Sequence, residues 1–364
     1  MKKIGILTYH ACYNYGACLQ AYALQQTIKK QYENCTIIDY QSKKLTDINH
    51  PFCRYPKHPK EIIKNITRLP YYHSLQKRQK LFEDFINHSL ILSRRCSNDQ
   101  EVMNECEQYD CIVCGSDQTW NLDPNIRYET SLYYLNFPKK QRRISYATSF
   151  GSWVNKFSTR EKELLPWIHE FDKLSMREES GVHLLKSKGF ECEWVLDPTL
   201  LLERDEYENI CTKRIINKPY VLLFSWNGVP ETIKITKIVE KELGCKAFYI
   251  VPPPRALFCG IERKLDIGPK EFISLIKHAE FVVTNSFHGT VFSTIFHKPF
   301  ISAIRDSIDP RRASLMKQLG LENHLVSPDT FDIATIMKTD FTAVEERLTP
   351  LRNKSIKYLY SAID

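Results

Sequence analysis

The chain has 364 residues, of which 43% are hydrophobic and 26% are charged, with 12 Gly and 18 Pro. This composition is ordinary for a soluble globular protein and excludes disordered, collagen-like and coiled-coil chains. The formal net charge of +8 is a modest excess, which suits an anionic small substrate without identifying one. At roughly 150 residues per domain, the length predicts about two domains with a cleft between them.

Few sequence features bear on location and cofactors. No stretch approaches the roughly 18 apolar residues that a membrane helix needs, and the apolar run after Lys2 and Lys3 is too short for a signal peptide. The 12 cysteines then indicate reduced cytosolic thiols. In the C-x-x-C of Cys111 and Cys114, a strand would point the two sulfurs to opposite faces, which favours buried side chains over a metal site. We expect a cytoplasmic protein with no metal and no organic cofactor, and association with the inner face of a membrane is left open.

The first predicted elements form a βαβ unit, with a strand at residues 3–8, a helix at 17–32 and a strand at 35–39. From residue 40 to residue 104 the pattern loosens into basic, Pro-containing segments with a helix at 74–87, and we expect an irregular insertion there. Strand-like runs return further along, at residues 110–114, 143–148, 173–176 and 193–196.

A second alternating series begins after residue 218. Its predicted strands lie at residues 220–225, 246–251, 281–284 and 299–303, and its helices at 230–243, 269–279 and 288–297. The two series predict an α/β protein with two Rossmann-like domains that face each other across a cleft. The expected boundaries are residues 1–210 for the acceptor-side domain, 211–340 for the donor-side domain, and 341–364 for a final helix that packs back on the first domain.

Several common nucleotide motifs are absent from the sequence. There is no G-x-x-x-x-G-K-[ST] loop, no G-x-G-x-x-G after a strand and no Asp-x-Asp. These absences disfavour kinases, dehydrogenases and metal-dependent glycosyl transfer. No basic stripe with interleaved aromatics is present, so nucleic acid is not an expected partner.

Ligands of open parallel sheets bind outside the carboxyl ends of the strands, so the loops after strands are the places to search. In the first such loop, Asn14, Tyr15 and Gly16 precede a helix. They either present backbone N–H groups to an anion or simply form the turn. We place them at the acceptor side of the cleft.

The second loop, GSDQTWN, follows the strand DCIVC. Ser116, Asp117 and Gln118 offer hydrogen-bonding groups beside Trp120, a set that resembles a carbohydrate site in which the sugar lies on the ring. The alternative is an Asx turn with Trp120 packed inward.

The third loop carries Arg177, whose guanidinium either makes a bidentate contact with an anionic ligand or pairs with Glu178 or Glu179. The fourth loop, TNSFHGT, turns from a buried strand into an apolar helix. Asn285 or Ser286 makes a natural N-cap, which places His288 in the first turn beside free N–H groups. The helix dipole favours a bound anion there and would let His288 exchange protons near neutral pH.

Taken together these loops resemble the polysaccharide pyruvyl transferase family. The segments that carry the resemblance are GILTYHACYNYGACLQAYALQ, CGSDQTWN, SYATSFG, LSMREESG, VLDPTLLL and GPKEFISLIKHAEFVVTNSFHGTVFSTIFHKPF, which appear in family order over residues 4–300. The resemblance implies a glycosyltransferase-B-like fold and transfer of the pyruvyl group of phosphoenolpyruvate onto two hydroxyls of a sugar or lipid-linked oligosaccharide. It also implies that His288 is catalytic and that Arg177 helps to hold the donor. We expect Asn285, Ser286 and Gly289, in the same loop as His288, to bind the donor as well.

One position departs from the family pattern. Many members carry Arg-Leu-His where this chain has Ser286-Phe287-His288, so the Arg expected two residues before the histidine is missing. The candidate replacements for its donor contact are Arg305, Arg311 and Arg312. Two alternatives stay open: a nucleotide-sugar-dependent glycosyltransferase of the same fold, and a non-catalytic protein that binds a glycan or a nucleotide.

Overall fold

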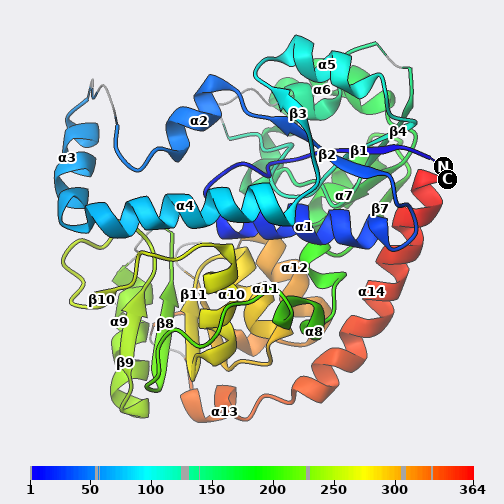
Figure 1. Cartoon of the computed structure of the whole chain (residues 1–364). Helices are drawn as coiled ribbons and strands as arrows, with labels where there is room; N and C mark the ends of the chain where they lie inside the picture. Colours follow the sequence, from blue (N-terminus) through cyan, green and yellow to red (C-terminus); the bar gives the residue numbers. More distant parts are fainter. Residues whose placement is uncertain are drawn as a thin grey trace.

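The structure of the chain is a computed structural model that describes residues 2–53, 56, 58–123, 131–138, 140–226, 230–304, 309–328 and 331–364. Two large parallel sheets, one in each half of the chain, are flanked by helices (Figure 1), which is the predicted α/β architecture.

The first sheet has the strand order β3-β2-β1-β4-β5, with every neighbouring pair parallel. Its strands are β1 (Ile4–Leu7), β2 (Cys35–Tyr40), β3 (Leu92–Cys96), β4 (Cys111–Cys114) and β5 (Arg142–Ser145). A small two-stranded sheet of β6 (Leu174–Met176) and β7 (Cys192–Trp194) lies beside β5, joined to it by an isolated bridge between Ile144 and Lys173. The strand order reverses between β1 and β4, which is where such sheets bind ligands.

The helices of this half surround the sheet and form its connections. They are α1 (Tyr15–Lys29), α2 (Lys43–Asn49), α3 (Pro59–Arg68), α4 (Tyr72–Ser89), α5 (Asp99–Cys106), α6 (Phe157–His169), α7 (Glu179–Ser187) and α8 (Arg204–Glu208). Short 3₁₀ helices lie between them: η1 (Leu69–Tyr71), η2 (Ser131–Tyr134), η3 (Gly151–Lys156) and η4 (Pro198–Leu200).

The helix predicted at residues 74–87 is confirmed as α4, but the prediction that the rest of residues 40–104 is irregular is wrong. The segment contains α2, α3, α4, most of α5 and the edge strand β3. Two of the elements that were not predicted, β3 and α3, lack the usual sequence pattern for physical reasons. As an edge strand, β3 exposes Arg94 and Arg95 and so lacks the apolar run of a central strand, and α3 buries none of its residues.

The second sheet has the order β10-β9-β8-β11-β12-β13, again parallel throughout. Its strands are β8 (Tyr220–Phe224), β9 (Lys246–Tyr249), β10 (Glu262–Arg263), β11 (Phe281–Thr284), β12 (Phe300–Ala303) and β13 (Leu325–Val326). The helices are α9 (Pro230–Leu243), α10 (Pro269–His278), α11 (Phe287–Ile295), α12 (Pro310–Leu319), η5 (Glu322–His324), α13 (Ile333–Met337) and α14 (Phe341–Ile363). The central strands β8 and β11 are buried along their whole length, which is why they appear as continuous apolar runs.

The two halves meet through an apolar contact between α1 and α10. The ring of Tyr15 stacks on that of Phe272 at 4.5 Å and 3°, and one buried cluster extends through both halves. Because burying apolar surface is the main favourable term in folding, this contact holds the two sheets in a defined relation.

The last helix, α14, runs from the second half along one edge of the molecule to the first (Figure 1). There the Tyr360 hydroxyl donates to the carbonyl of Thr27 at 2.9 Å, and Arg142 Nε donates to that of Ala362 at 2.6 Å. None of the described helices is both long enough and apolar enough to span a bilayer.

Candidate functional site

Two cavities lie where the carboxyl ends of the two sheets meet. The His288 cavity, of about 480 Å³, is bordered by the loops after β4, β8, β11 and β12. The α3 cavity, of about 690 Å³, lies between α3, α4 and the loop after β9. Asn14, Asp117 and Trp226 border both, so the two cavities adjoin each other.

The loop TNSFHGT places His288 as predicted, in the first turn of α11. Ser286 is the N-cap, and its hydroxyl accepts a hydrogen bond from the N–H of Gly289 at 3.4 Å. The Asn285 side chain accepts from the N–H of Trp226 at 3.2 Å, which links this loop to the end of β8. Asn285, Ser286 and His288 all border the His288 cavity. Close packing requires a glycine at position 289, because a Cβ there would lie 2.3 Å from the Thr284 hydroxyl.

The carboxylate of Asp197 faces His288: its Oδ2 lies 3.7 Å from His288 Nε2, within ion-pair distance, and Nε2 has no hydrogen-bond partner among the described residues. Asp197 caps η4, and its other oxygen accepts from the N–H and the hydroxyl of Thr199 at 3.0 and 2.6 Å. The Ser116 hydroxyl lies 3.1 Å from Oδ2. Because η4 packs against both α1 and α11, the carboxylate sits between the two halves.

Burial by itself would raise the pKa of the Asp197 carboxyl. His288, Arg177 and Thr199 lower the pKa by more than burial raises it, so it lies well below its ordinary value. Asp197 is therefore a carboxylate at neutral pH.

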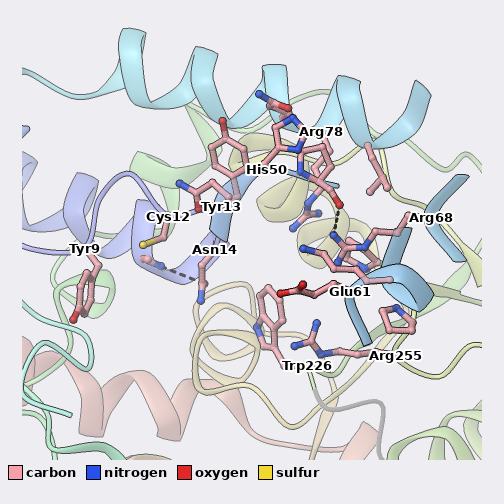
Figure 2. A pocket seen from close by; sticks show the side chains of 18 of the residues that line it. Tyr9, Cys12, Tyr13, Asn14, His50, Glu61, Arg68, Arg78, Trp226 and Arg255 are labelled. Atoms are coloured by element: carbon pink, nitrogen blue, oxygen red, sulfur yellow. Dashed lines mark hydrogen bonds between the residues drawn. The ribbon is translucent and has the colours of Figure 1, made fainter. Parts of the chain in front are cut away.

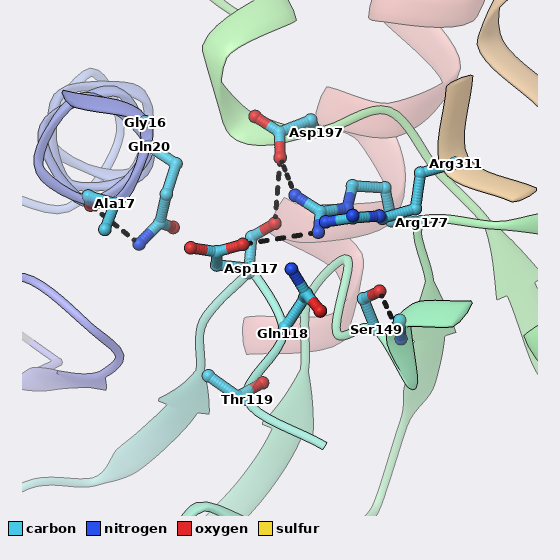
Figure 3. A network of polar contacts seen from close by, with 12 residues as sticks. Gly16, Ala17, Gln20, Asp117, Gln118, Thr119, Ser149, Arg177, Asp197 and Arg311 are labelled. Carbon is cyan, nitrogen blue, oxygen red and sulfur yellow. Dashed lines mark hydrogen bonds and ion pairs between the residues drawn. The ribbon is translucent and has the colours of Figure 1, made fainter. Parts of the chain in front are cut away.

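Arg177 is held by two carboxylates (Figure 3). Its guanidinium contacts Asp197 Oδ2 at 2.6 Å and Asp117 Oδ1 at 3.4 Å, and it lies over the ring of Phe287 at 4.5 Å. It is 4% exposed and does not border the His288 cavity. The alternative of a structural arginine therefore describes Arg177 better than a donor ligand does, with Asp197 and Asp117 as partners in place of the glutamates.

Glu178 is buried beneath this network. Its Oε1 accepts from the N–H of Phe150 at 2.8 Å, and its Oε2 has no partner among the described residues. Burial raises the pKa of Glu178 to about 6, although Arg177 opposes the rise.

Some side chains of the loop after β4 border the His288 cavity, and others are buried in the core. Asp117 and Gln118 border the His288 cavity, whereas the Ser116 hydroxyl is buried and also donates to the carbonyl of Ala147 at 2.9 Å. Trp120 is fully buried, and its Nε1 donates to the carbonyl of Tyr133 at 3.0 Å. Trp120 as a sugar platform is thus wrong, and the inward-packed alternative is right, because the indole N–H finds its acceptor inside.

The first loop also differs from its predicted role. Asn14 borders both cavities, but its side-chain oxygen accepts from the N–H groups of Gly16 and Ala17 at 3.0 and 3.4 Å, so these donors are not free for an anion. Tyr15 as an acceptor-side residue is corrected, because its ring is fully buried against Phe272.

Gly16 places α1 directly against the His288 ring. A Cβ on Gly16 would lie 1.9 Å from His288 Nδ1, closer than any atom could stay. The glycine is therefore required for contact between the first turns of α1 and α11, rather than for binding.

Two of the three arginines proposed to replace the missing one border the His288 cavity. Arg311 is paired with Asp309, which caps α12, and Arg312 Nη1 donates to the Ser302 hydroxyl and the Ala303 carbonyl, both at 2.9 Å. Arg305 lies outside the described residues.

Sequence reasoning assigned no role to Asp197. The segment VLDPT carried part of the resemblance, and one signal was available, because an Asp before Pro after a strand is a typical cap. The meeting of Asp197 with Arg177 and His288, from three separate loops, has no local signal.

Comparison with solved structures shows the fold. A structure described as UDP-N-acetylglucosamine 2-epimerase from Listeria monocytogenes has a TM-score of 0.52 and 11% identity, and covers 98% of this chain and 91% of that one. The UDP-GlcNAc 2-epimerase of Methanocaldococcus jannaschii has a TM-score of 0.51, 15% identity and coverage of 95% and 92%. At these identities the similarity shows the glycosyltransferase-B-like fold alone.

No curated protein sequence matches the chain. The model of the polysaccharide pyruvyl transferase family matches residues 14–307, which is most of the chain and includes Asn14, Asp117, Arg177, Asp197 and His288. With the fold and the order of its loops, this match shows that the chain belongs to the polysaccharide pyruvyl transferase family.

Proposed function

We propose that the chain transfers the pyruvyl group of phosphoenolpyruvate to two hydroxyls of a polysaccharide sugar or its lipid-linked precursor, forming a cyclic ketal and releasing phosphate. The observation that carries this proposal is His288, held in the first turn of α11 at the edge of a polar cavity, with the buried carboxylate of Asp197 beside one ring nitrogen.

The donor is an enol ester, so the first step adds a proton to its methylene carbon and a sugar hydroxyl to the neighbouring carbon. Loss of phosphate and addition of the second hydroxyl then close the ketal. Of the two hydroxyl protons, one balances the proton gained by the methyl group and the other leaves with phosphate. His288 exchanges the proton, and a well-placed group of this kind contributes roughly 10²- to 10⁴-fold in rate.

Asp197 lies beside Nε2 and offsets the charge of the imidazolium, which leaves Nδ1 for the reactants. The first-turn N–H groups of α11 and the guanidinium of Arg311 face the anionic donor from the same cavity. Ser286, which stands where many members have Arg, caps the helix.

The test is a donor screen followed by one substitution. Calorimetry should show binding of phosphoenolpyruvate and not of UDP- or GDP-sugars, whereas the reverse would favour the glycosyltransferase alternative. His288→Ala should lower phosphate release to background while leaving the circular dichroism spectrum unchanged. His297→Ala, just beyond the other end of α11 and paired with Glu345 at 3.1 Å, is the matched control and should retain activity. Undiminished phosphate release by His288→Ala would refute the assignment.

A further inference from the structure

The α3 cavity has an excess of positive charge that the proposed reaction does not use. Lys60, Lys64 and Arg68 of α3, Arg78 of α4 and Arg255 of the loop after β9 all border it. In the described part of the chain, no carboxylate forms an ion pair with any of these five. Figure 2 shows Arg68, Arg78 and Arg255 at one end of the cavity, with Tyr9 at the other.

Two carboxylates, those of Glu61 and Asp117, also border the α3 cavity, so its cations outnumber its acids. Arg68 Nε donates to the carbonyl of Pro253 at 2.7 Å, so a neutral acceptor stands where an acid would otherwise be. Burial, together with the nearby charges of Arg255 and Arg78, lowers the pKa of Arg68 to about 10. Burial and Arg68 likewise lower the pKa of Lys64. An anion bound among them would relieve this repulsion.

The outer face of α3 is apolar and exposed. Ile62, Ile63 and Ile66 are 46%, 51% and 60% exposed, and Leu69 just beyond the helix is 61% exposed. Residues 60, 64 and 68 lie one turn apart on the helix, and residues 62 and 66 lie on the opposite side. The face of α3 toward the cavity is therefore basic, and its outer face is apolar.

The second half of the chain contributes further exposed apolar side chains next to α3. The loop between β9 and β10 lies below α3 at one side of the molecule (Figure 1), and it carries Phe258, which is 95% exposed, and Leu257, which is 36% exposed. Among the described residues, seven of the ten exposed large hydrophobic side chains belong to this loop or to residues 62–72. A short helix of this kind, with lysines and arginines opposite its apolar face, is typical of helices that lie in a membrane interface.

We propose that α3 and the loop between β9 and β10 dock on an anionic bilayer, so that the α3 cavity receives the diphosphate of a lipid-carried acceptor. The inference rests on the proposed function for its acceptor, and it names the surface and the site. The diphosphate binds the cations at the α3 end, and the attached sugar extends past Asn14 and Asp117 toward His288, because these residues border both cavities.

Vesicle flotation tests the docking surface. The protein should float with vesicles that contain phosphatidylglycerol, less so at high salt, and only weakly with phosphatidylcholine alone. Ile62→Ser/Ile66→Ser/Phe258→Ser should lower the partition coefficient roughly tenfold or more. The matched control is Ile238→Ser/Met337→Ser, at positions 37% and 43% exposed elsewhere, which should float like wild type. Equal flotation of the triple variant would overturn the proposal, as would a dimer that this variant dissociates and that does not float.

A second arm tests the cavity. Phosphatidylcholine vesicles doped with a polyprenyl diphosphate should bind wild-type protein roughly tenfold more tightly than undoped vesicles, and inorganic diphosphate should compete. Lys64→Gln/Arg255→Gln should abolish that preference, while Lys241→Gln on α9, which borders neither cavity, should keep it. No preference in wild-type protein would refute the diphosphate site. Calorimetry with phosphoenolpyruvate, which needs no membrane, reports separately on the proposed function.

Discussion

Asp197 shows how much of this site depends on one buried charge. It contacts Arg177 at 2.6 Å, lies 3.7 Å from His288 and accepts two hydrogen bonds from Thr199. A buried network of charged groups is favourable only while every member is present, because removing one member leaves the others desolvated and unpaired.

Asp197→Asn should therefore reduce both stability and turnover. We expect urea denaturation to show a loss of about 3 kcal/mol, and kinetics to show a fall in kcat with little change in KM for phosphoenolpyruvate. Asp39→Asn is the control, since Asp39 forms a similar buried pair with His10 at 2.8 Å and neither residue borders a cavity. This variant should lose stability while keeping kcat. Parallel losses of kcat in both variants would mean that Asp197 only supports the fold.

Glu178 should make stability depend on pH in the opposite sense to Asp197. Burial raises its pKa to about 6, so the folded state binds its proton more tightly than the unfolded state. The stability it contributes is present below the unfolded value and is lost as pH rises through about 6. Relative to Glu178→Gln, wild-type protein should lose about 1 kcal/mol of unfolding free energy between about pH 5 and about pH 8, measured by urea denaturation. A difference that does not change with pH would contradict the raised pKa.

At the scale of elements, the site is made where two helix N-termini meet. The first turn of α1 contacts the first turn of α11 through Gly16 and His288, and η4 packs against both helices. Each of these two helices follows a strand at which the strand order of its sheet reverses: α1 follows β1, and α11 follows β11. The two switch points thus combine into one cleft.

Gly16→Ala should push α1 away from α11. The new methyl group would overlap the His288 ring, so we expect a loss of about 2 kcal/mol in urea denaturation and a fall in phosphate release. In the Gly16→Ala/His288→Ala double variant the ring is absent, so the double variant should be as stable as His288→Ala alone. An undiminished stability penalty from Gly16→Ala in the His288→Ala background would show that the glycine matters for another reason.

At the scale of the whole molecule, one apolar cluster crosses between the halves. Phe272 of α10 contacts Tyr15 of α1 at 4.5 Å and Phe224 of β8 at 5.0 Å, and all three are buried. Inter-domain contacts that are mainly polar allow hinge motion by default, whereas a buried aromatic contact couples the two halves.

Phe272→Ala should therefore weaken both sheets together. We expect about 3 kcal/mol less stability, and hydrogen exchange should show protection falling in β4 of the first half as well as in β11 of the second. Phe248→Ala is the control, because this half-buried ring on β9 contacts Tyr220 of the second half, at 6.1 Å. Loss of protection confined to the second half in Phe272→Ala would mean that the halves unfold independently.

The sequence by itself determined the α/β class, the strands buried on both faces, an N-cap at Asn285 or Ser286 and the place of His288, because each depends on periodicity or on neighbours within a few residues. The tertiary structure decided the rest. Arg177 faces Asp197 and Asp117, Tyr15 joins the core and Trp120 turns inward because residues distant in sequence supply their partners. Strand order and packing bring those partners together, and no local pattern encodes such a meeting. The same holds for α3, whose two faces acquire a meaning only once the cavity lies on one side and solvent on the other.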